Sequence, residues 1–170
     1  MKLNNLITCS AFWLTFSFLH LTVSYHAMST NALGNETDRI ALLKFKESVS
    51  DDPYGVLRSW NDSTHFCSWN GVTCGHRHQR VTGLKLRDYK LSGNISPYIR
   101  NLTFLRSFNL MNNSFFGEIP YQVCHLSRLQ NLALSLNKLQ GELSSLNLSY
   151  CLELKRVKSW REQTYRANSH

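Results

Sequence analysis

Two consecutive stretches of the chain are written in the same pattern. Residues 102–120 read LTFLRSFNLMNNSFFGEIP, and residues 126–143 read LSRLQNLALSLNKLQGEL. Four positions return at a constant 24-residue step: Leu105 as Leu129, Leu110 as Leu134, Asn113 as Asn137 and Gly117 as Gly141. We call this step the repeat period. A fixed period of this length is typical of a solenoid, in which each repeat forms one coil and neighbouring coils stack.

A third copy of the pattern precedes these two. Five of its residues stand one repeat period before their counterparts in residues 108–119: Leu84, Leu86, Leu91, Gly93 and Ile95. Within each copy the L-x-L segment predicts a short strand whose residues alternate between inside and outside. The residues expected to point inward are Leu84, Leu86, Phe108, Leu110, Leu132 and Leu134.

Polar and glycine positions complete each coil. Asn113 and Asn137 follow the strands, and their amides are expected to bond backbone groups of the next coil as a structural ladder. Tyr89 occupies this place in the first coil, so the ladder should be imperfect there. Gly117 and Gly141 permit tight turns.

Residues 1–27 have the layout of a secretory signal peptide. Lys2 gives a positive start, and residues 6–23 are apolar and contain no Asp or Glu. We expect cleavage after Ser24 or Ala27. The alternative is an uncleaved N-terminal anchor, but polar residues interrupt the run and its length is near the lower limit for spanning. The expected location is the secretory pathway and the extracellular space.

The charge balance does not indicate nucleic-acid binding. The chain of 170 residues carries a formal charge of +8, but its basic residues are scattered apart from a loop at 77–80 and a tail at 155–166. Aromatic residues do not interleave with them as a nucleic-acid surface requires. We prefer a solvated basic surface, with wall or membrane polyanions as the alternative ligands.

Six N-x-S/T sequons occur in this secreted chain and predict glycosylation. They are Asn35, Asn61, Asn94, Asn101, Asn112 and Asn147. Asn94 and Asn101 lie between predicted strands, where a glycan can project. Asn112 is the less clear case, because it stands beside a residue expected to be buried.

Residues 35–60 predict a helical cap over the first coil. Asn35 or Thr37 suits the N-cap, and Asp38 suits the positive end of the helix dipole. The segment 51–53 ends this helix, and a second short helix follows. The apolar face at roughly helical spacing consists of Ile40, Leu43 and Val49, with Leu42 and Phe45 beside them.

The segment HFCSWNGVTC, residues 65–74, contains two cysteines. In a secreted chain, Cys67 and Cys74 are expected to form a disulfide. A zinc site is the alternative, because His65, His76 and His78 lie nearby, but the spacing fits no common zinc finger. We therefore expect no metal site and no cofactor.

Taken together, these motifs resemble one family. The segment CSWNGVTC, the preceding DRIALLKFK helix and the 24-residue repeats resemble the N-terminal part of plant leucine-rich-repeat receptor-like kinases and receptor-like proteins. The repeats are similar to that family's form LxxLxxLxLxxNxLxGxIP. The segment CGHRHQRVTGLKL, residues 74–86, resembles the subfamily that contains pathogen-sensing receptor kinases of rice. The resemblance covers about residues 36–157, and it implies a bridge between Cys67 and Cys74.

The resemblance and the repeats together predict the fold class and domains. We expect an α/β leucine-rich-repeat solenoid with an N-terminal helical, disulfide-bonded cap, and about three 24-residue coils plus a partial fourth. The expected domains are a signal peptide at 1–27, the cap at 28–79, repeats at 80–157 and a non-repeat tail at 158–170.

The fourth coil departs from the pattern. Cys151 follows Leu126 by one position more than the repeat period, which indicates one inserted residue, and Ser159 stands where a strand leucine is expected. Cys124 and Cys151 fall in adjacent coils; two buried thiols are the preferred interpretation and a bridge is the alternative.

The outward residues of the concave strands are the candidate binding face, because solenoids usually bind on that face. Stacking by one repeat period aligns Lys85 with Asn109, Arg87 with Met111, and Thr82 with Arg106. The alternative is that these are only solvated strand positions. The full candidate set is Thr82, Lys85, Arg87, Arg106, Asn109, Met111, Gln130 and Ser135.

The motif inventory predicts a recognition protein and not an enzyme. It contains no nucleophile elbow, H-E-x-x-H or phosphate loop, and the kinase glycine-rich and catalytic loops are missing. We expect the extracellular N-terminal part of a plant receptor-like kinase or receptor-like protein, in defence or developmental signalling. Its partners would be a peptide or protein ligand and, as a further candidate, a co-receptor. The alternatives are a small secreted inhibitor or decoy, and a nonfunctional truncated product.

Overall fold

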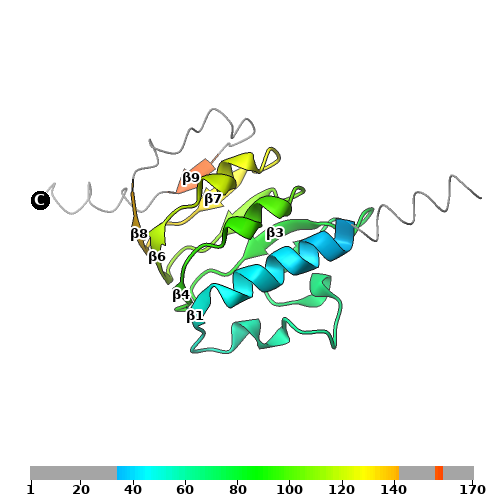
Figure 1. Cartoon of the computed structure of the whole chain (residues 1–170), viewed down its shortest axis with the longest axis horizontal. Coiled ribbons are helices and arrows are strands. Elements are labelled where there is room, and N and C mark those ends of the chain that lie inside the picture. Colours follow the sequence, from blue (N-terminus) through cyan, green and yellow to red (C-terminus); the bar gives the residue numbers. More distant parts are fainter. Residues whose placement is uncertain (1–33, 142–155, 159–170) are drawn as a thin grey trace, which may run out of the picture. The chain divides into compact units, whose positions relative to one another are not determined.

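Two β-sheets run through the part of the chain that the computed structural model describes, residues 34–141 and 156–158 (Figure 1). An N-terminal helix spans residues 34–47. The four-stranded sheet has the order β1 (Val49–Asp51), β4 (Ser92–Gly93), β6 (Ser114–Glu118) and β8 (Lys138–Gln140). The five-stranded sheet has the order β2 (Val72–Cys74), β3 (Val81–Lys85), β5 (Ser107–Asn109), β7 (Asn131–Ala133) and β9 (Arg156–Lys158).

Short 3-10 helices fill the remaining connections of the coils and the cap. They are η1 (Val56–Ser59), η2 (Phe66–Ser68), η3 (Pro97–Asn101) and η4 (Tyr121–His125). The first corresponds to the expected second short helix of the cap. The Asp52 carboxylate begins it, because its two oxygens accept hydrogen bonds from the backbone N–H groups of Val56 and Leu57 at 2.9 and 2.8 Å.

The parallel strands pair in register with the sequence period. Leu84 of β3 pairs with Phe108 of β5, which pairs with Leu132 of β7, and each step equals the repeat period. Leu132 then pairs with Val157 of β9, so the last step is longer than the period by one position. The longer step agrees with the predicted insertion of one residue before the last strand.

The prediction of inward-pointing strand residues is confirmed. All six residues named for this role are at most 2% exposed, and they belong to one core with the apolar residues of the cap. Phe45 of the N-terminal helix packs edge-on against Phe108, with ring centroids 6.3 Å apart. Trp60 stacks on Trp69 at 5.5 Å between centroids. Helix, cap loop and strands therefore share a single apolar interior.

The apolar face predicted for the N-terminal helix was partly wrong. The flanking residues Leu42 and Phe45 are fully buried, but of the predicted face itself Ile40 is 43% exposed and Leu43 is only half-buried. The buried face consists of Asp38, Ala41, Leu42 and Phe45, at the i, i+3, i+4, i+7 spacing of one helix side. Ile40 lies two residues from both Asp38 and Leu42, which turns it toward the opposite side.

Two further details of the cap differ from expectation. The helix already includes residues 34–36, so neither Asn35 nor Thr37 is its N-cap. Val49 lies in β1, which pairs antiparallel with β4 opposite Gly93. A Cβ atom on Gly93 would stand 2.3 Å from the carbonyl oxygen of Ser48, so only glycine lets the cap join this sheet.

The two repeat asparagines bond backbone groups of their own coil and of the preceding coil. Asn113 Nδ2 donates to the carbonyl oxygens of Leu86 and Leu110 at 2.6 and 2.9 Å. Its Oδ1 accepts from the N–H groups of Tyr89 and Leu91. Asn137 repeats the pattern, donating to the carbonyl oxygens of Leu110 and Leu134 and accepting from Phe115 N–H. The expected direction, toward the next coil, was wrong, because the preceding strand ends with its free carbonyl facing the amide.

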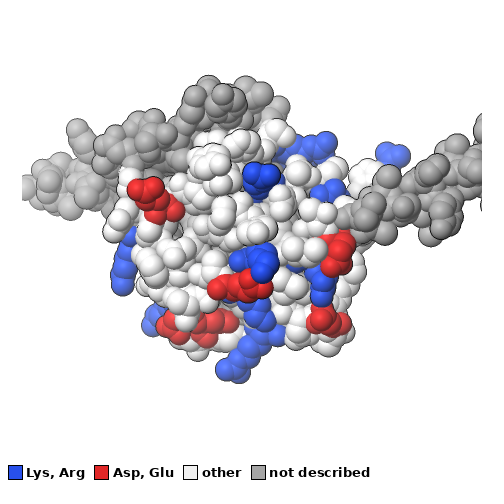
Figure 2. Space-filling view, viewed as in Figure 1, with Lys and Arg blue, Asp and Glu red and all other residues white. Residues whose placement is uncertain are grey.

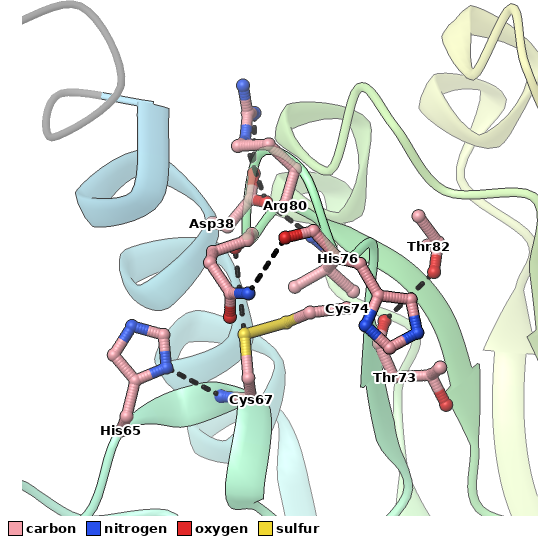
Figure 3. Close-up of a disulfide and its surroundings, with 10 residues drawn as sticks. Asp38, His65, Cys67, Thr73, Cys74, His76, Arg80 and Thr82 are labelled. Carbon is pink, nitrogen blue, oxygen red and sulfur yellow. Dashed lines mark hydrogen bonds and ion pairs between the residues drawn. A yellow bond between two sulfur atoms is a disulfide. The ribbon is translucent and has the colours of Figure 1, made fainter. Parts of the chain in front are cut away.

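A buried ion pair joins the N-terminal helix to the first strand of the repeats (Figure 3). Asp38 is fully buried, and its carboxylate accepts two hydrogen bonds from Arg80, at 2.9 Å from Nε and 2.7 Å from Nη2. The same carboxylate accepts from the backbone N–H of Val81 at 2.8 Å. The Arg80 side chain is only 15% exposed, so both charges are largely removed from water.

The Arg80 guanidinium also begins a row of side chains at one position of consecutive coils. Arg80, Phe104 and Arg128 follow one another at the repeat period. The guanidinium carbons of Arg80 and Arg128 lie 4.7 and 4.0 Å from the centroid of the Phe104 ring. Arg80 Nη2 further donates to the hydroxyl of Thr103 at 3.2 Å.

We expect Asp38→Ala to lower the free energy of unfolding by about 3–5 kcal/mol, because it leaves the Arg80 charge largely buried without a partner. Urea denaturation of the disulfide-bonded chain measures this change. The matched control is Asp62→Ala, which removes an exposed carboxylate paired with Arg39. An exposed pair contributes at most about 1 kcal/mol. Equal losses for the two variants would contradict the role of Asp38.

Three residues at one repeat position have a left-handed backbone. Asp88, Asn112 and Leu136 follow one another at the repeat period and have φ values of 65°, 56° and 61°. Asn and Asp tolerate this region because their short polar side chains bond locally, whereas leucine has no such compensation. Asn112 and Asp88 also bond each other across adjacent coils, where Asn112 Nδ2 donates to Asp88 Oδ1 at 2.7 Å.

Leu136→Asn is therefore expected to raise the free energy of unfolding by about 1 kcal/mol, since it relieves the strain of a left-handed leucine. Leu136 is 36% exposed, so the apolar burial that Asn loses at this position offsets part of the gain. Thermal and urea unfolding measure the gain. Lys138→Asn places the same residue in the adjacent strand, where φ is negative, and should give no stabilisation. A gain for both variants, or for neither, would refute the explanation.

Candidate recognition surface

The solvent-directed side of the five-stranded sheet, here called the outer face, is formed by alternate residues of its strands. In β5, Phe108 is fully buried, whereas Ser107 and Asn109 on either side of it are half-buried. In β7, Leu132 is buried between half-buried Asn131 and Ala133. The strand register aligns Lys85 with Asn109 and Asn109 with Ala133. Equivalent side chains of successive coils therefore form rows across the outer face.

The eight residues proposed from the sequence differ in their accessibility. Lys85, Arg87 and Arg106 are exposed. Backbone bonds from Arg106 N–H to Thr82 and from Gln130 N–H to Arg106, both 2.8 Å, hold one row together. The five half-buried members are Thr82, Asn109, Met111, Gln130 and Ser135.

Several of these side chains already have partners within the fold. Arg87 Nε donates to Asp88 Oδ2 at 2.6 Å, so its charge is paired. Asn109 Oδ1 accepts from the backbone N–H of Met111 at 2.9 Å. By contrast, the side chains of Lys85 and Arg106 form no hydrogen bond or ion pair with any residue in 34–141. These two cations are the most available charges among the eight.

A hollow of about 390 Å³ opens at the end of the outer face nearest the cap. We call it the cap-end hollow. Strand β2, the turn after it, β3 and the start of β5 form its walls. Its lining residues are Thr73, Cys74, Gly75, His76, Thr82, Gly83, Lys85, Arg106 and Ser107.

The disulfide holds one wall of this hollow in place. Cys67 and Cys74 are bridged, with their Cα atoms 5.5 Å apart, and Cys74 is the last residue of β2. Strand β2 pairs antiparallel with β3, and Thr73 lies opposite Gly83. Figure 3 shows Thr73, His76 and Thr82 beside Cys74, with Asp38 and Arg80 toward the N-terminal helix. The bridge thus fixes the hairpin that carries Thr73 and His76.

The three histidines near the cysteines do not come together as a metal site. Within residues 34–141, no group of three His, Cys, Asp or Glu side chains is arranged to hold a metal ion. His65 instead accepts a hydrogen bond from the Cys67 N–H through Nδ1 at 3.2 Å, at the start of η2. His76 lines the cap-end hollow, and the His78 ring lies 6.3 Å from that of Phe104.

The sequons differ in their surroundings. Asn61, Asn94 and Asn112 are exposed, and Asn35 and Asn101 are half-buried. Asn101 lines another hollow, of about 300 Å³, with residues of η3 and η4. Asn147 lies outside the described residues. Cys124 is a buried free thiol, and its suggested neighbour Cys151 also lies outside the described part.

The sequence reasoning missed one row of the outer face and one wall of the hollow. Gly83, Ser107 and Asn131 pair with one another across β3, β5 and β7, two residues before the row that starts at Lys85. The alternation of strand residues could have identified this row. The positions of Thr73 and His76 were harder to predict from the sequence, because no repeat of the pattern covers the antiparallel hairpin of β2 and β3.

Acidic and basic side chains are interspersed on the face seen in Figure 2, in keeping with the scattered basic residues of the sequence. In the described ranges, 34–141 and 156–158, none of the helices combines the length and the apolar character needed to cross a membrane.

Comparison with known proteins identifies the relatives of this chain. Residues 35–75 match the family described as leucine rich repeat N-terminal domain. The LRR receptor-like serine/threonine-protein kinase EFR of Arabidopsis thaliana is 49% identical over 121 residues, which are 71% of this chain and 12% of that protein. The chain therefore spans only a small part of the kinase relatives that it matches.

Solved structures of plant receptor ectodomains have the same fold. The ectodomain of BIR2 from Arabidopsis thaliana is 34% identical, with a TM-score of 0.65 over 72% of this chain and 66% of that one. The Arabidopsis receptor kinase HAESA, in complex with the peptide hormone IDA and the co-receptor SERK1, is 30% identical. Its TM-score is 0.63 over 70% of this chain and 20% of that one.

The fold is thus an α/β leucine-rich-repeat solenoid with an N-terminal helix and a disulfide. The chain is a homologue of plant leucine-rich-repeat receptor-like kinases, and its residues 35–75 match the leucine rich repeat N-terminal domain.

Proposed function

We propose that the chain is an extracellular recognition module of the receptor-like kinase or receptor-like protein type, which binds a peptide or protein on its outer face. The observation that carries this proposal is the in-register array of polar side chains on the outer face, exemplified by Lys85, Asn109 and Ser107. The sheet leaves such side chains little conformational freedom. Ligand binding therefore costs less side-chain entropy of the protein. Recognition, and not catalysis, is the activity that such an array supports.

The proposed organisation follows the sequence. A signal peptide at 1–27 is followed by the cap at 28–79, by repeats at 80–157 and by a tail at 158–170. The repeat region comprises about three coils and a partial fourth. Two findings support this: the pairing of β3, β5 and β7 at the repeat period, and the longer step to β9. In this proposal the chain acts outside the cell or at the plasma membrane, in defence or developmental signalling.

The proposed partners are a peptide or protein ligand and a co-receptor. The complex of HAESA with a peptide hormone and a co-receptor supports this choice for a homologous fold. The chain matches only 20% of HAESA and 12% of EFR, so their whole activities are not transferred here. Signal transmission would belong to a co-receptor or to a kinase part outside the matched region.

The proposal is tested by selecting a random peptide display library on the immobilised secreted chain. We expect enriched peptides whose binding falls at least tenfold in the triple variant Arg87→Ala, Arg106→Ala, Asn109→Ala. The loss of three interface side chains at about 0.5–1 kcal/mol each supports this size of effect. Biolayer interferometry of the selected peptides against both proteins measures it.

A matched control removes the same side-chain types elsewhere. Arg58→Ala, Arg100→Ala, Gln140→Ala deletes two exposed arginines and one exposed amide outside the outer face. This variant should bind the selected peptides within about twofold of the original chain, which is within the roughly ±0.5 kcal/mol of neutral surface changes. The proposal fails if no peptide is enriched, or if both triple variants lose binding equally.

We also propose that the sequons carry N-linked glycans. Asn61, Asn94 and Asn112 are exposed, so a glycan on each is compatible with the folded chain. At Asn112 one amide hydrogen would remain for the bond to Asp88. After secretion from plant cells, peptide N-glycosidase treatment in heavy-oxygen water should convert these asparagines to labelled Asp, detected by mass spectrometry. Asn131, which has no sequon and is followed by leucine and not by the deamidation-prone glycine, is the negative control. Unmodified Asn at all three positions would disprove the proposal.

A further inference from the structure

Within the proposed recognition function, we propose that the cap-end hollow binds a carboxylate of the peptide ligand, from an acidic side chain or the C-terminus. The inference rests on that function and names the chemistry of one subsite. It follows from the shape of the hollow, from the charges that line it and from the neutral surface beside it.

At the cap end of one row of the outer face stands Gly83, which has no side chain and lines the hollow. Asn131, Ser107 and Gly83 pair in sequence across β7, β5 and β3, so the side chains become smaller toward the cap. Thr73 closes the row as the partner of Gly83 in β2. A Cβ atom on Gly83 would lie 3.3 Å from the Thr73 Cβ, so a larger residue at this position would press against Thr73 and narrow the hollow that both residues line.

The charges around the hollow have one sign. His76, Lys85 and Arg106 are its ionisable lining residues besides the bridged Cys74, and none of the nine lining residues is Asp or Glu. Within residues 34–141, no acidic side chain pairs with any of these three. Two further arginines, Arg80 and Arg87, are paired with Asp38 and Asp88. The hollow is therefore an unsatisfied positive site.

Its chemistry suits a carboxylate. A guanidinium offers parallel N–H groups that match the two oxygens of a carboxylate, and Lys85 adds a point charge. The hydroxyl of Ser107 is a further donor in the lining. Thr82 contributes less, because its hydroxyl donates to the carbonyl oxygen of Thr73 at 3.2 Å. The volume of about 390 Å³ is at the small end of ligand sites and fits one or two residues of a peptide.

The surface next to the hollow favours a peptide over a uronic acid polysaccharide. Beyond Arg106, the outward residues of β5 and β7 are Ser107, Asn109, Asn131 and Ala133, all uncharged. A polymer with an acid on every sugar would need a cation at every strand, whereas in these rows basic residues return only at β9, as Arg156 and Lys158. A peptide with one acidic group and a neutral remainder matches the observed distribution, because amide and hydroxyl side chains suit its backbone.

The test titrates the isotope-labelled, disulfide-bonded full chain with two end-blocked peptides, Gly-Glu-Glu-Gly and Gly-Gln-Gln-Gly, and with trigalacturonate. NMR shifts should saturate at the backbone amides of Thr73, Gly83 and Ser107. The acidic peptide should bind at least about fivefold more tightly than its amide counterpart, the effect of one charge-assisted hydrogen bond. Its binding should weaken with added salt.

Two variants and a matched control locate the binding. Gly83→Asn places the repeat's own residue in the hollow without changing charge, and Lys85→Gln removes one lining charge. Each variant should raise the Kd for the acidic peptide about fivefold. Lys138→Gln makes the same charge change at an exposed position of β8 and should leave affinity within about twofold. Urea unfolding of each variant verifies that it is folded.

Several results would overturn the inference. One is the absence of saturable shifts at Gly83 and Ser107, and another is unchanged affinity in both hollow variants. Tighter binding of trigalacturonate than of the acidic peptide would exclude the peptide assignment. If display-selected peptides lose binding in the outer-face triple variant but not in Gly83→Asn or Lys85→Gln, the recognition function stands and the carboxylate site fails.

Discussion

The fold depends on the buried carboxylate of Asp38. It bonds the Arg80 guanidinium and the first N–H of β3, so the N-terminal helix and the first repeat strand are fixed to each other through one side chain. Every later strand of the five-stranded sheet takes its register from β3. The carboxylate is satisfied by three hydrogen bonds, which offsets the loss of hydration that burying a charge entails. The cap is therefore part of the solenoid and not a separate lid.

The regular part of this structure was predictable, because one physical rule repeats. Leu84, Phe108 and Leu132 occupy equivalent places, and a constant repeat period leaves no other way to bury them together. The cap obeys no such repetition. Ile40 of the cap helix was predicted to point inward. In the structure the polar Asp38 is buried on the inward side of this helix, and Ile40 is exposed. A sequence pattern based on hydrophobicity cannot anticipate a buried acid whose partner is as distant along the chain as Arg80.

The candidate site was likewise predictable from the sequence only in its repeated part. Residues of repeated strands, such as Lys85 and Asn109, were placed together correctly by their spacing. Thr73 and His76 come from a hairpin that occurs once, so their arrival at the hollow depends on the tertiary fold and on the disulfide that fixes β2. The hollow lies between residues of β2, β3 and β5, so it could be recognised only once these three strands were placed together.

The row of Arg80, Phe104 and Arg128 bears on whether the coils are interchangeable modules. Neighbouring strands of a sheet lie about 4.8 Å apart, so equivalent side chains of adjacent coils meet at close range. The aromatic ring separates two guanidinium groups and attracts both through its face. Exchanging the order of these coils would bring the two cations side by side, without the ring between them. Although the coils share one backbone conformation, the electrostatics of this row fixes the order in which they follow one another in the sequence.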